Sequence, residues 1–442
     1  MNIRIKLFFM IIALLFTMSS LTSSAKGDLL SLSLKELMNV NIGSPYSGKI
    51  FQSEVTPITA DSYNFALMIP VGTVPQYSAE IIAAADLAAS KVNEMGGING
   101  KKLAIVGADD GALSDISVTL ANRLIQEYRI SAIIGAGNSD VAEELLKQVS
   151  IPNKVPLLTH SASSNRLAEI SGGKYFWRML TSNQGQVKII ADELEQLNRL
   201  DRVYLIKDRT LYSKEMTKGI KEELTYRGNS IVGELTISEL VDIATMNLRS
   251  EVNSMIKAKP HAVFVTLKSE KLPQFMQAID KLWHGSKPLF IMGDTVKPVS
   301  FKGFDIEHLS PCIKFLISQE SSSTSAPLQE HINALLKINN SGFDSAYIYD
   351  SIFLMAMAKS LEKSKNIPIN EALKRLTNGS KLITENHYPD IESMFNKNAS
   401  FRYRGMSGQI QFDHQGQNIH AKMLIRKLKQ TTSSQNKCLQ AL

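Results

Sequence analysis

Apolar runs of strand length alternate with helix-length amphipathic segments along most of the chain. The first series predicts strands at Phe65–Ile69, Leu103–Val106, Ala132–Ile134 and Pro156–Leu158. The segments between these runs have helical spacing, as at Ser117–Tyr128 and Val141–Gln148. A strand that is followed by a helix and then by another strand is the repeating unit of a parallel sheet.

A second series of the same kind begins after Trp177. Its predicted strands are Val203–Ile206, Ser230–Glu234, Ala262–Thr266 and Leu289–Ile291. Its predicted helices are Gln186–Asn198, Lys214–Arg227, Ala244–Ala258 and Lys271–Leu282. Two series of this length predict an α/β protein with two doubly wound parallel-sheet lobes, each covered by helices on both faces.

Two helical segments have the composition of core helices. Ile81–Asp110 begins with an alanine-rich helix, breaks at Asn93–Gly97, and continues as a short strand with an acidic end. The small side chains allow such a helix to lie close to a sheet. The second segment, Ser345–Ser360, carries alanine, methionine and aromatic residues on several sides, which indicates a buried helix rather than a cofactor site.

The first residues have the pattern of an export signal. Arg4 and Lys6 precede the apolar run Leu7–Met18, and Ser23 and Ala25 suit a cleavage site. We therefore expect residues 1–25 to be a signal peptide and the mature protein to lie in the periplasm. An uncleaved membrane anchor is the alternative, although the run is short for a span of about 20 residues.

Composition and charge narrow the function. The chain has 442 residues and a formal net charge of +7, with no long basic run, so we expect no nucleic-acid partner. The two cysteines, Cys312 and Cys438, leave open whether a disulfide forms. No nucleophile elbow, phosphate-binding loop or zinc-protease motif occurs in the sequence, so we expect neither an enzyme nor a bound metal or cofactor.

Several short sequence motifs occur along the chain in the order in which a known family has them. Besides the segment Ile81–Asp110, they are SAIIGAGNS at 131–139, VPLLTHSASSNRL at 155–167, YFWRMLTSNQGQ at 175–186, VYLIKDRTLYSKE at 203–215 and GMSGQIQFDHQG at 405–416. Together they resemble the type I periplasmic binding proteins of the leucine/isoleucine/valine-binding group. The resemblance implies one binding domain over 61–430. Its expected parts are lobe one, about 61–180 and 319–412, and lobe two, about 181–318 and 413–430, joined by a hinge and followed by a polar tail at 431–442.

The same resemblance implies ligand-binding positions. Ser139 and Ser163 match hydroxyl positions that hold a ligand carboxylate, and Ser161 matches a backbone contact. Tyr77 and Tyr212 match aromatic residues that cover the ligand from lobe one and lobe two. Each serine could instead be an ordinary helix cap.

The chain also departs from the amino-acid binders. Lys268 stands where they have an aromatic residue, and Asn138 stands at one of their lobe-one cysteine positions. Thr295 occupies the place of the carboxylate that faces the ligand's ammonium group, with Asp294 one position away. A buried ammonium without a counter-charge is costly, so either Asp294 serves that role or the ligand is not a free α-amino acid. We include Asn138, Lys268 and Asp294 among the expected ligand-binding residues.

We therefore predict an exported solute-binding protein that captures an amino acid, amide or small carboxylate for ABC-type uptake, with a membrane permease as partner. The alternative is a periplasmic ligand sensor that signals to a membrane receptor. Within the expected extension and linker at 26–60, the phrase LSLKELMNVNI resembles a short segment of exported proteins such as TonB-dependent receptors. The segment 28–53 is accordingly either a docking motif for a further partner or a leader helix packed on the domain.

Overall fold

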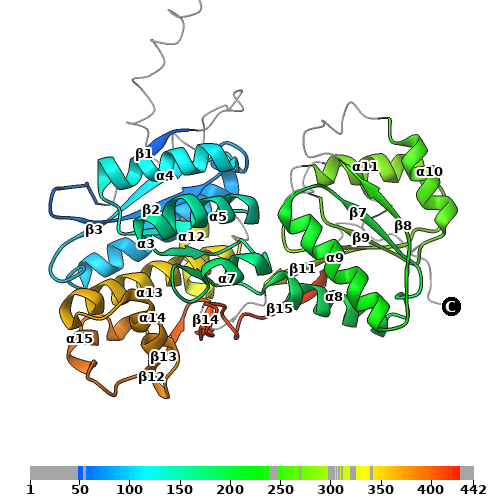
Figure 1. The fold of residues 1–442 in the computed structure, drawn as a ribbon. Helices are drawn as coiled ribbons and strands as arrows, with labels where there is room; N and C mark the ends of the chain where they lie inside the picture. Colours follow the sequence, from blue (N-terminus) through cyan, green and yellow to red (C-terminus); the bar gives the residue numbers. More distant parts are fainter. Residues whose placement is uncertain are drawn as a thin grey trace, which may run out of the picture.

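The structure is a computed structural model that describes residues 48–52, 56–237, 247–267, 271–296, 312–318, 325–338 and 342–428, together with Phe304, Ile306 and Leu309. The described residues form two lobes, each built on a six-stranded sheet (Figure 1). Lobe one, on the left of Figure 1, contains the N-terminal series of strands, and lobe two contains the second series. The prediction of an α/β protein with two doubly wound lobes is confirmed.

The sheet of lobe one is parallel except at one edge. Its strands lie in the order β1-β3-β2-β4-β5-β6. Their bounds are β1 Ile50–Gln52, β2 Tyr63–Ile69, β3 Leu103–Asp109, β4 Ala132–Gly135, β5 Leu157–Thr159 and β6 Phe176–Arg178. Only β1 runs antiparallel to its neighbour, β3. The central strands are buried along nearly their whole length, which explains their continuous apolar runs.

Helices cover both faces of this sheet. Phe65 and Leu67 of β2 share a core with α3 and α13, whereas Ala66 and Met68 share another with α4 and α5. The alternation follows from the twofold period of side chains along a strand. The helices of lobe one are α3 Pro75–Glu94, α4 Ser114–Tyr128, α5 Ser139–Leu145, the π-turn Leu146–Ser150, α6 Ile151–Asn153, α7 Asn165–Ser171 and α12 Ala326–Leu336.

Helix α13, Asp344–Lys365, is the most deeply buried helix of lobe one. Every residue from Asp344 to Leu361 is buried, because the helix packs between α3 on one side and α14 on the other. The small alanine side chains of α3 also allow this close approach of α13. The chain then forms α14 Ile369–Thr377, the 3₁₀ turn Glu385–His387, α15 Ile391–Met394 and a small sheet of β12 Lys381–Ile383, β13 Phe401–Gly405 and β14 Gly408–Ile410.

Lobe two repeats the arrangement. Its strands lie in the order β15-β11-β10-β9-β7-β8, with bounds β7 Val203–Lys207, β8 Ile231–Thr236, β9 Ala262–Val265, β10 Leu289–Met292, β11 Ile313–Ser318 and β15 Met423–Lys427. Helices α8 Asn183–Gln196 and α9 Leu211–Tyr226 cover one face of the sheet. Helices α10 Arg249–Ala258 and α11 Leu272–Leu282 cover the other. Only the edge strand β15 is antiparallel.

The chain passes between the lobes three times. It leaves lobe one after β6, returns to lobe one after β11, and enters lobe two again after β14 to form β15. In Figure 1 the last of these passages, from β14 to β15, runs between the two lobes. Each lobe is therefore assembled from segments that are far apart in the sequence.

One expectation about the N-terminal extension is wrong. Ile50–Gln52 was expected in the linker, but it forms β1 and extends the lobe-one sheet. The ring of Phe51 lies directly over Gly107, where an added methyl group would come within 2.0 Å of the ring. A three-residue strand is too short to give a periodic signal. Residues 1–47, including most of the 28–53 segment, lie outside the described part of the chain.

Within the described ranges, no helix is both long enough and apolar enough to cross a membrane. Cys312 is buried in lobe two and is disulfide-bonded. Cys438 lies outside the described residues.

Candidate functional site

The loop between β4 and α5 supplies two of the predicted residues. Gly135 has a φ of +129°, and a side chain there would lie 2.3 Å from the carbonyl oxygen of Met68. After this turn, Asn138 caps α5 by accepting a hydrogen bond from the Val141 amide at 2.8 Å. Ser139 follows as the first residue of the helix and is buried. Asn138 therefore orders the loop that presents Ser139.

The loop between β5 and α7 is organised by a threonine. Thr159 Oγ1 accepts hydrogen bonds from the amides of Ser161 and Ala162, at 3.2 and 3.0 Å. The same hydroxyl donates to the carbonyl of Ala136 in the neighbouring loop, at 3.1 Å. Ser163 is buried, and its carbonyl accepts from the Asn183 amide at 2.8 Å. The two serine-containing loops thus form one hydrogen-bonded unit at the carboxyl end of the lobe-one sheet.

Ser164 connects this unit to its surroundings through all three of its polar groups. Its amide donates to Ser139 Oγ at 3.2 Å, and its hydroxyl donates to Glu215 of lobe two at 2.6 Å. Its carbonyl accepts from the guanidinium of Arg178 at 2.7 Å. The sequence prediction included Ser161 and Ser163 but missed this residue.

Tyr77 lies at the start of α3, beside the β5–α7 loop. Its hydroxyl is 2.9 Å from Asp344 Oδ2 and 2.9 Å from His160 Nε2. Since a carboxylate can only accept, Tyr77 donates to Asp344 and accepts from the imidazole N–H of His160. Burial and the Asp344 charge raise the pKa of Tyr77 well above its ordinary value, so the phenol stays protonated. Its ring also stacks near His160, with centroids 6.2 Å apart.

Tyr212 and Asp294 meet in lobe two. Burial, followed by the Asp294 charge, raises the pKa of Tyr212 well above its ordinary value. Gly293 makes this placement possible, because a methyl group there would lie 1.9 Å from the Tyr212 hydroxyl. Asp294 in turn accepts from Gln186 Nε2 at 2.8 Å. The carboxylate is therefore held in one orientation between α8 and α9.

Arg178 is a fully buried cation at the first passage between the lobes. Besides Ser164, its guanidinium donates to the carbonyl of Ala162 at 3.4 Å and to Gln417 Oε1 at 2.7 Å. Burial lowers its pKa to about 10, so it remains charged at neutral pH. The signal for it in the sequence is a single arginine inside the apolar run of Phe176, Trp177, Met179 and Leu180.

Two carboxylates bridge the lobes. Asp140 of α5 accepts from the Leu211 amide at the start of α9, at 3.1 and 3.2 Å from its two oxygens. Glu215 of α9 accepts from Ser164 and from the Asn165 amide at 2.8 Å. Glu215 also accepts from Asn183 Nδ2, on the hinge side, at 2.9 Å. The loops that carry the predicted serines therefore lie against lobe two.

The predicted residues fall into two groups. Asn138, Ser139, Ser161, Ser163 and Tyr77 gather at the carboxyl end of the lobe-one sheet. Tyr212 and Asp294 lie together in lobe two, and Lys268 lies outside the described residues. Their role in binding stays a prediction.

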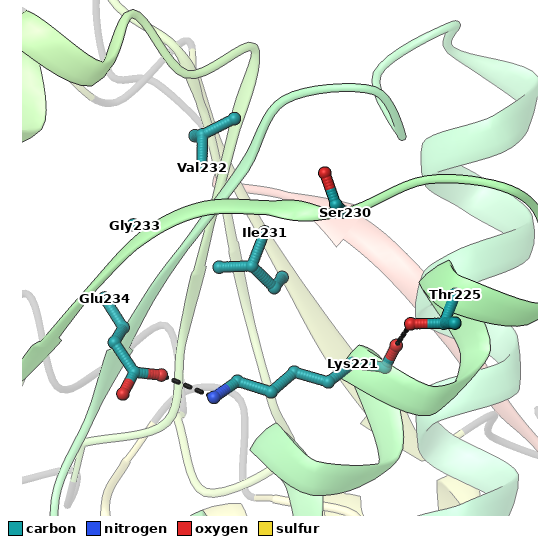
Figure 2. A pocket seen from close by; sticks show the side chains of 7 residues that line it. All are labelled: Lys221, Thr225, Ser230, Ile231, Val232, Gly233 and Glu234. Atoms are coloured by element: carbon teal, nitrogen blue, oxygen red, sulfur yellow. Dashed lines mark hydrogen bonds and ion pairs between the residues drawn. The ribbon is translucent and has the colours of Figure 1, made fainter.

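A shallow depression on the outer side of lobe two has a different character. Figure 2 shows its lining along the edge strand β8 and helix α9, made by Lys221, Thr225, Ser230, Ile231, Val232, Gly233 and Glu234. Lys221 and Glu234 form an ion pair across it at 2.6 Å. Because the charges of Lys221 and Glu234 neutralise each other, the depression does not resemble a binding site for an ion. Among the described residues, no three histidine, cysteine, aspartate or glutamate side chains gather as a metal ion would require.

The fold and the bridged loops define a class: two-lobed α/β proteins that hold a solute at the carboxyl ends of their strands. A sequence model of the family described as periplasmic binding protein matches residues 70–293, just over half of the chain. The chain belongs to the periplasmic binding protein family. The predicted family membership is confirmed.

Individual relatives agree with this assignment. An amino acid binding protein from Pseudomonas aeruginosa is 26% identical over 147 residues, which cover 33% of this chain and 38% of that protein. The chain thus matches well under half the length of this relative.

Among solved structures, the branched-chain amino acid transporter substrate-binding protein LivJ from Streptococcus pneumoniae, in complex with isoleucine, has a TM-score of 0.67. It is 18% identical, and the match covers 83% of this chain and 99% of LivJ. A solute-binding protein of an ABC transporter from R. palustris, in complex with benzoate, has a TM-score of 0.64 at 15% identity, over 83% of this chain and 93% of that one. At these identities the likeness establishes the fold.

Proposed function

We propose that the protein is an exported binding protein that captures a small polar solute between its lobes and delivers it to an ABC-type permease. The observation that carries the proposal is the single hydrogen-bonded unit of two serine-containing loops at the carboxyl end of the lobe-one sheet, which is bonded to lobe two through Ser164 and Glu215. Hydroxyls and backbone amides suit a carboxylate, and a carboxylate suits an amine or amide. The favoured ligands are therefore an amino acid, an amide or a small carboxylate.

The ligands of two similar proteins differ in whether they carry an ammonium group. One is in complex with isoleucine, which carries an ammonium group, and another with benzoate, which carries none. Asp294 is the residue of this chain that would favour the first kind of ligand. Because Gln186 and Tyr212 hold Asp294 in place, its charge is fixed where a ligand amine would meet it.

A thermal-shift screen of the mature protein tests the proposal. The panel consists of amino acids, their amides, and small aliphatic and aromatic carboxylates including benzoate. A ligand at 100 times its Kd stabilises the folded state by about 2.7 kcal/mol and raises Tm accordingly. If no member of the panel raises Tm, the proposed ligand class is wrong.

A variant then separates the two ligand types. Asp294→Ala should weaken binding of amine-bearing ligands and leave a simple carboxylate unaffected, as measured by calorimetry. An amino acid that binds the variant as tightly as the wild type would exclude Asp294 as its ammonium partner.

A sensor that signals to a membrane receptor is the second candidate. It is favoured by Thr295, which stands where amino-acid transport proteins have their carboxylate, and by the additional 28–53 segment. Deleting residues 28–47, which leaves strand β1 in place, and measuring uptake and localisation in cells distinguishes the roles. A docking role predicts that either one changes, whereas a leader helix predicts that neither does. N-terminal sequencing of the periplasmic fraction tests cleavage near Ala25.

A further inference from the structure

Glu215 is the acceptor of four donors from outside its own helix. Its two oxygens receive the Ser164 hydroxyl, the Asn165 amide and the Asn183 side-chain amide, at 2.6, 2.8 and 2.9 Å, and the Arg166 amide more weakly at 3.5 Å. Ser164 and Asn165 belong to lobe one, and Asn183 begins the helix that follows the first passage.

Ser164 relays this contact to the predicted ligand loops. Its amide holds Ser139 Oγ, and its carbonyl is held by the buried Arg178. Every polar group of Ser164 is therefore used, and each reaches a different part of the molecule: the β4–α5 loop, the hinge and lobe two. A movement of Glu215 away from lobe one would release one of these three anchors and loosen the loop that orders Ser139.

We infer that Glu215 is a positioning residue, which orders the 159–164 loop when the lobes close and so couples closure to ligand binding. Asp140 makes the reciprocal contact, because it extends from lobe one to the start of α9. The inference rests on the proposed function for its ligand part. Its structural part, the link between closure and loop order, stands independently of any ligand.

The test uses the mature protein without ligand. Glu215→Gln replaces a carboxylate with a side chain that has one acceptor oxygen and an NH₂ group. The Gln oxygen can serve the Asn165 and Asn183 donors, and the NH₂ group then faces the Ser164 hydroxyl and the Arg166 amide. The Ser164 hydroxyl must turn from donor to acceptor, the Arg166 amide loses its acceptor, and the negative charge that strengthened all these hydrogen bonds is gone. Ser164→Ala removes only the hydroxyl. The matched control is Glu222→Gln, since Glu222 is an exposed acid on the same helix.

Two measurements read the result. Small-angle X-ray scattering should give a larger radius of gyration for Glu215→Gln and a smaller increase for Ser164→Ala. Hydrogen exchange at the amides of Ser164 and Asn165 should speed up roughly tenfold for Glu215→Gln, the change expected from losing one charged hydrogen bond. Glu222→Gln should match the wild type in both. Unchanged scattering and exchange in Glu215→Gln would overturn the inference.

Ligand binding gives a third measurement that a merely structural role would not affect. For every panel compound that stabilises the wild type, Glu215→Gln should raise Kd by a similar factor of roughly ten, because closure becomes harder whatever the ligand. An effect confined to one ligand would instead indicate direct contact and overturn the positioning role. If no panel compound binds the wild type, the proposed function fails, while the scattering and exchange results still decide the coupling.

Discussion

Tyr77 was expected to cover a ligand, yet its hydroxyl already lies between two protein groups. The phenol donates to Asp344 and accepts from His160, so it fixes an imidazole in the β5–α7 loop. A covering role for the ring stays a prediction. The Tyr77 hydroxyl connects helix α3 to helix α13 and to the β5–α7 loop.

Tyr77→Phe should destabilise the protein by about 1–3 kcal/mol, because it takes a hydrogen-bond donor away from a buried carboxylate. Urea unfolding measures this change. Tyr226→Phe is the matched control, since Tyr226 is 88% exposed and its substitution should change the unfolding free energy by less than about 0.5 kcal/mol. Equal effects of the two substitutions would contradict the role assigned to Tyr77.

The sequence predicted the position of a single residue correctly where that residue belongs to a recognisable sequence motif. Ser161 and Ser163 do lie in a loop at the end of a strand, and Ser139 is the first residue of the helix after the neighbouring strand. Ser164, Arg178 and Glu215 were missed for a physical reason: Glu215 lies 51 residues from Ser164, and their contact exists only because the lobes approach each other. No local pattern encodes such an approach.

Strands and helices were more predictable than single contacts, because each gives a periodic spacing of apolar residues in the sequence. The strand predicted at Leu103–Val106 extends to Asp109 in the structure. A strand can continue beyond its apolar run when the neighbouring strand pairs with it, as β2 does here. The helix expected from Ala244 begins, within the described residues, at Arg249. Strand β1 was missed, because three residues are too few for a period.

One buried acid joins two elements and gives a pH effect. Asp350 of α13 accepts from the amides of Met406 and Ser407, at 2.9 and 2.7 Å, in the turn between β13 and β14. Burial raises its pKa from 3.8 to about 7, despite these hydrogen bonds. Because the folded state holds the proton more tightly than the unfolded chain, this group's contribution to stability falls as the pH rises from about 4 to about 7.

Urea unfolding of the wild type and Asp350→Asn across that range checks the effect. The wild-type advantage over the variant should shrink as the pH rises, by an amount on the order of 2–4 kcal/mol over the whole window. Asp61→Asn serves as the control, since the side chain of Asp61 is 89% exposed. A difference between wild type and Asp350→Asn that does not change with pH would contradict the prediction.

At the scale of the whole molecule, lobe one depends on distant segments. Tyr77 and Asp344 are in contact although 267 residues separate them, and α13 shares a core with the strands of the first series. The two-lobed fold could be predicted from the two series of alternating elements. Which late segments complete which lobe came from the resemblance to a family, because periodicity carries no information about long-range order.

A fragment of residues 56–178 should therefore fail to fold. It contains β2 to β6 and α3 but lacks α13, so the apolar face that α3 and α13 cover together is left partly exposed. We expect no cooperative urea transition by circular dichroism. Residues 56–178 joined by a flexible linker to 325–412 should regain the transition. Cooperative unfolding of the short fragment alone would refute this dependence.

The three passages between the lobes also bear on the entropy of binding. Two separate bodies that close on a solute lose translational and rotational freedom, a loss estimated at several kcal/mol. Here the covalent connections have already removed most of that freedom, so the effective concentration of one lobe at the other is high before any solute arrives. A few hydrogen bonds to a small molecule are then enough to hold the two halves together.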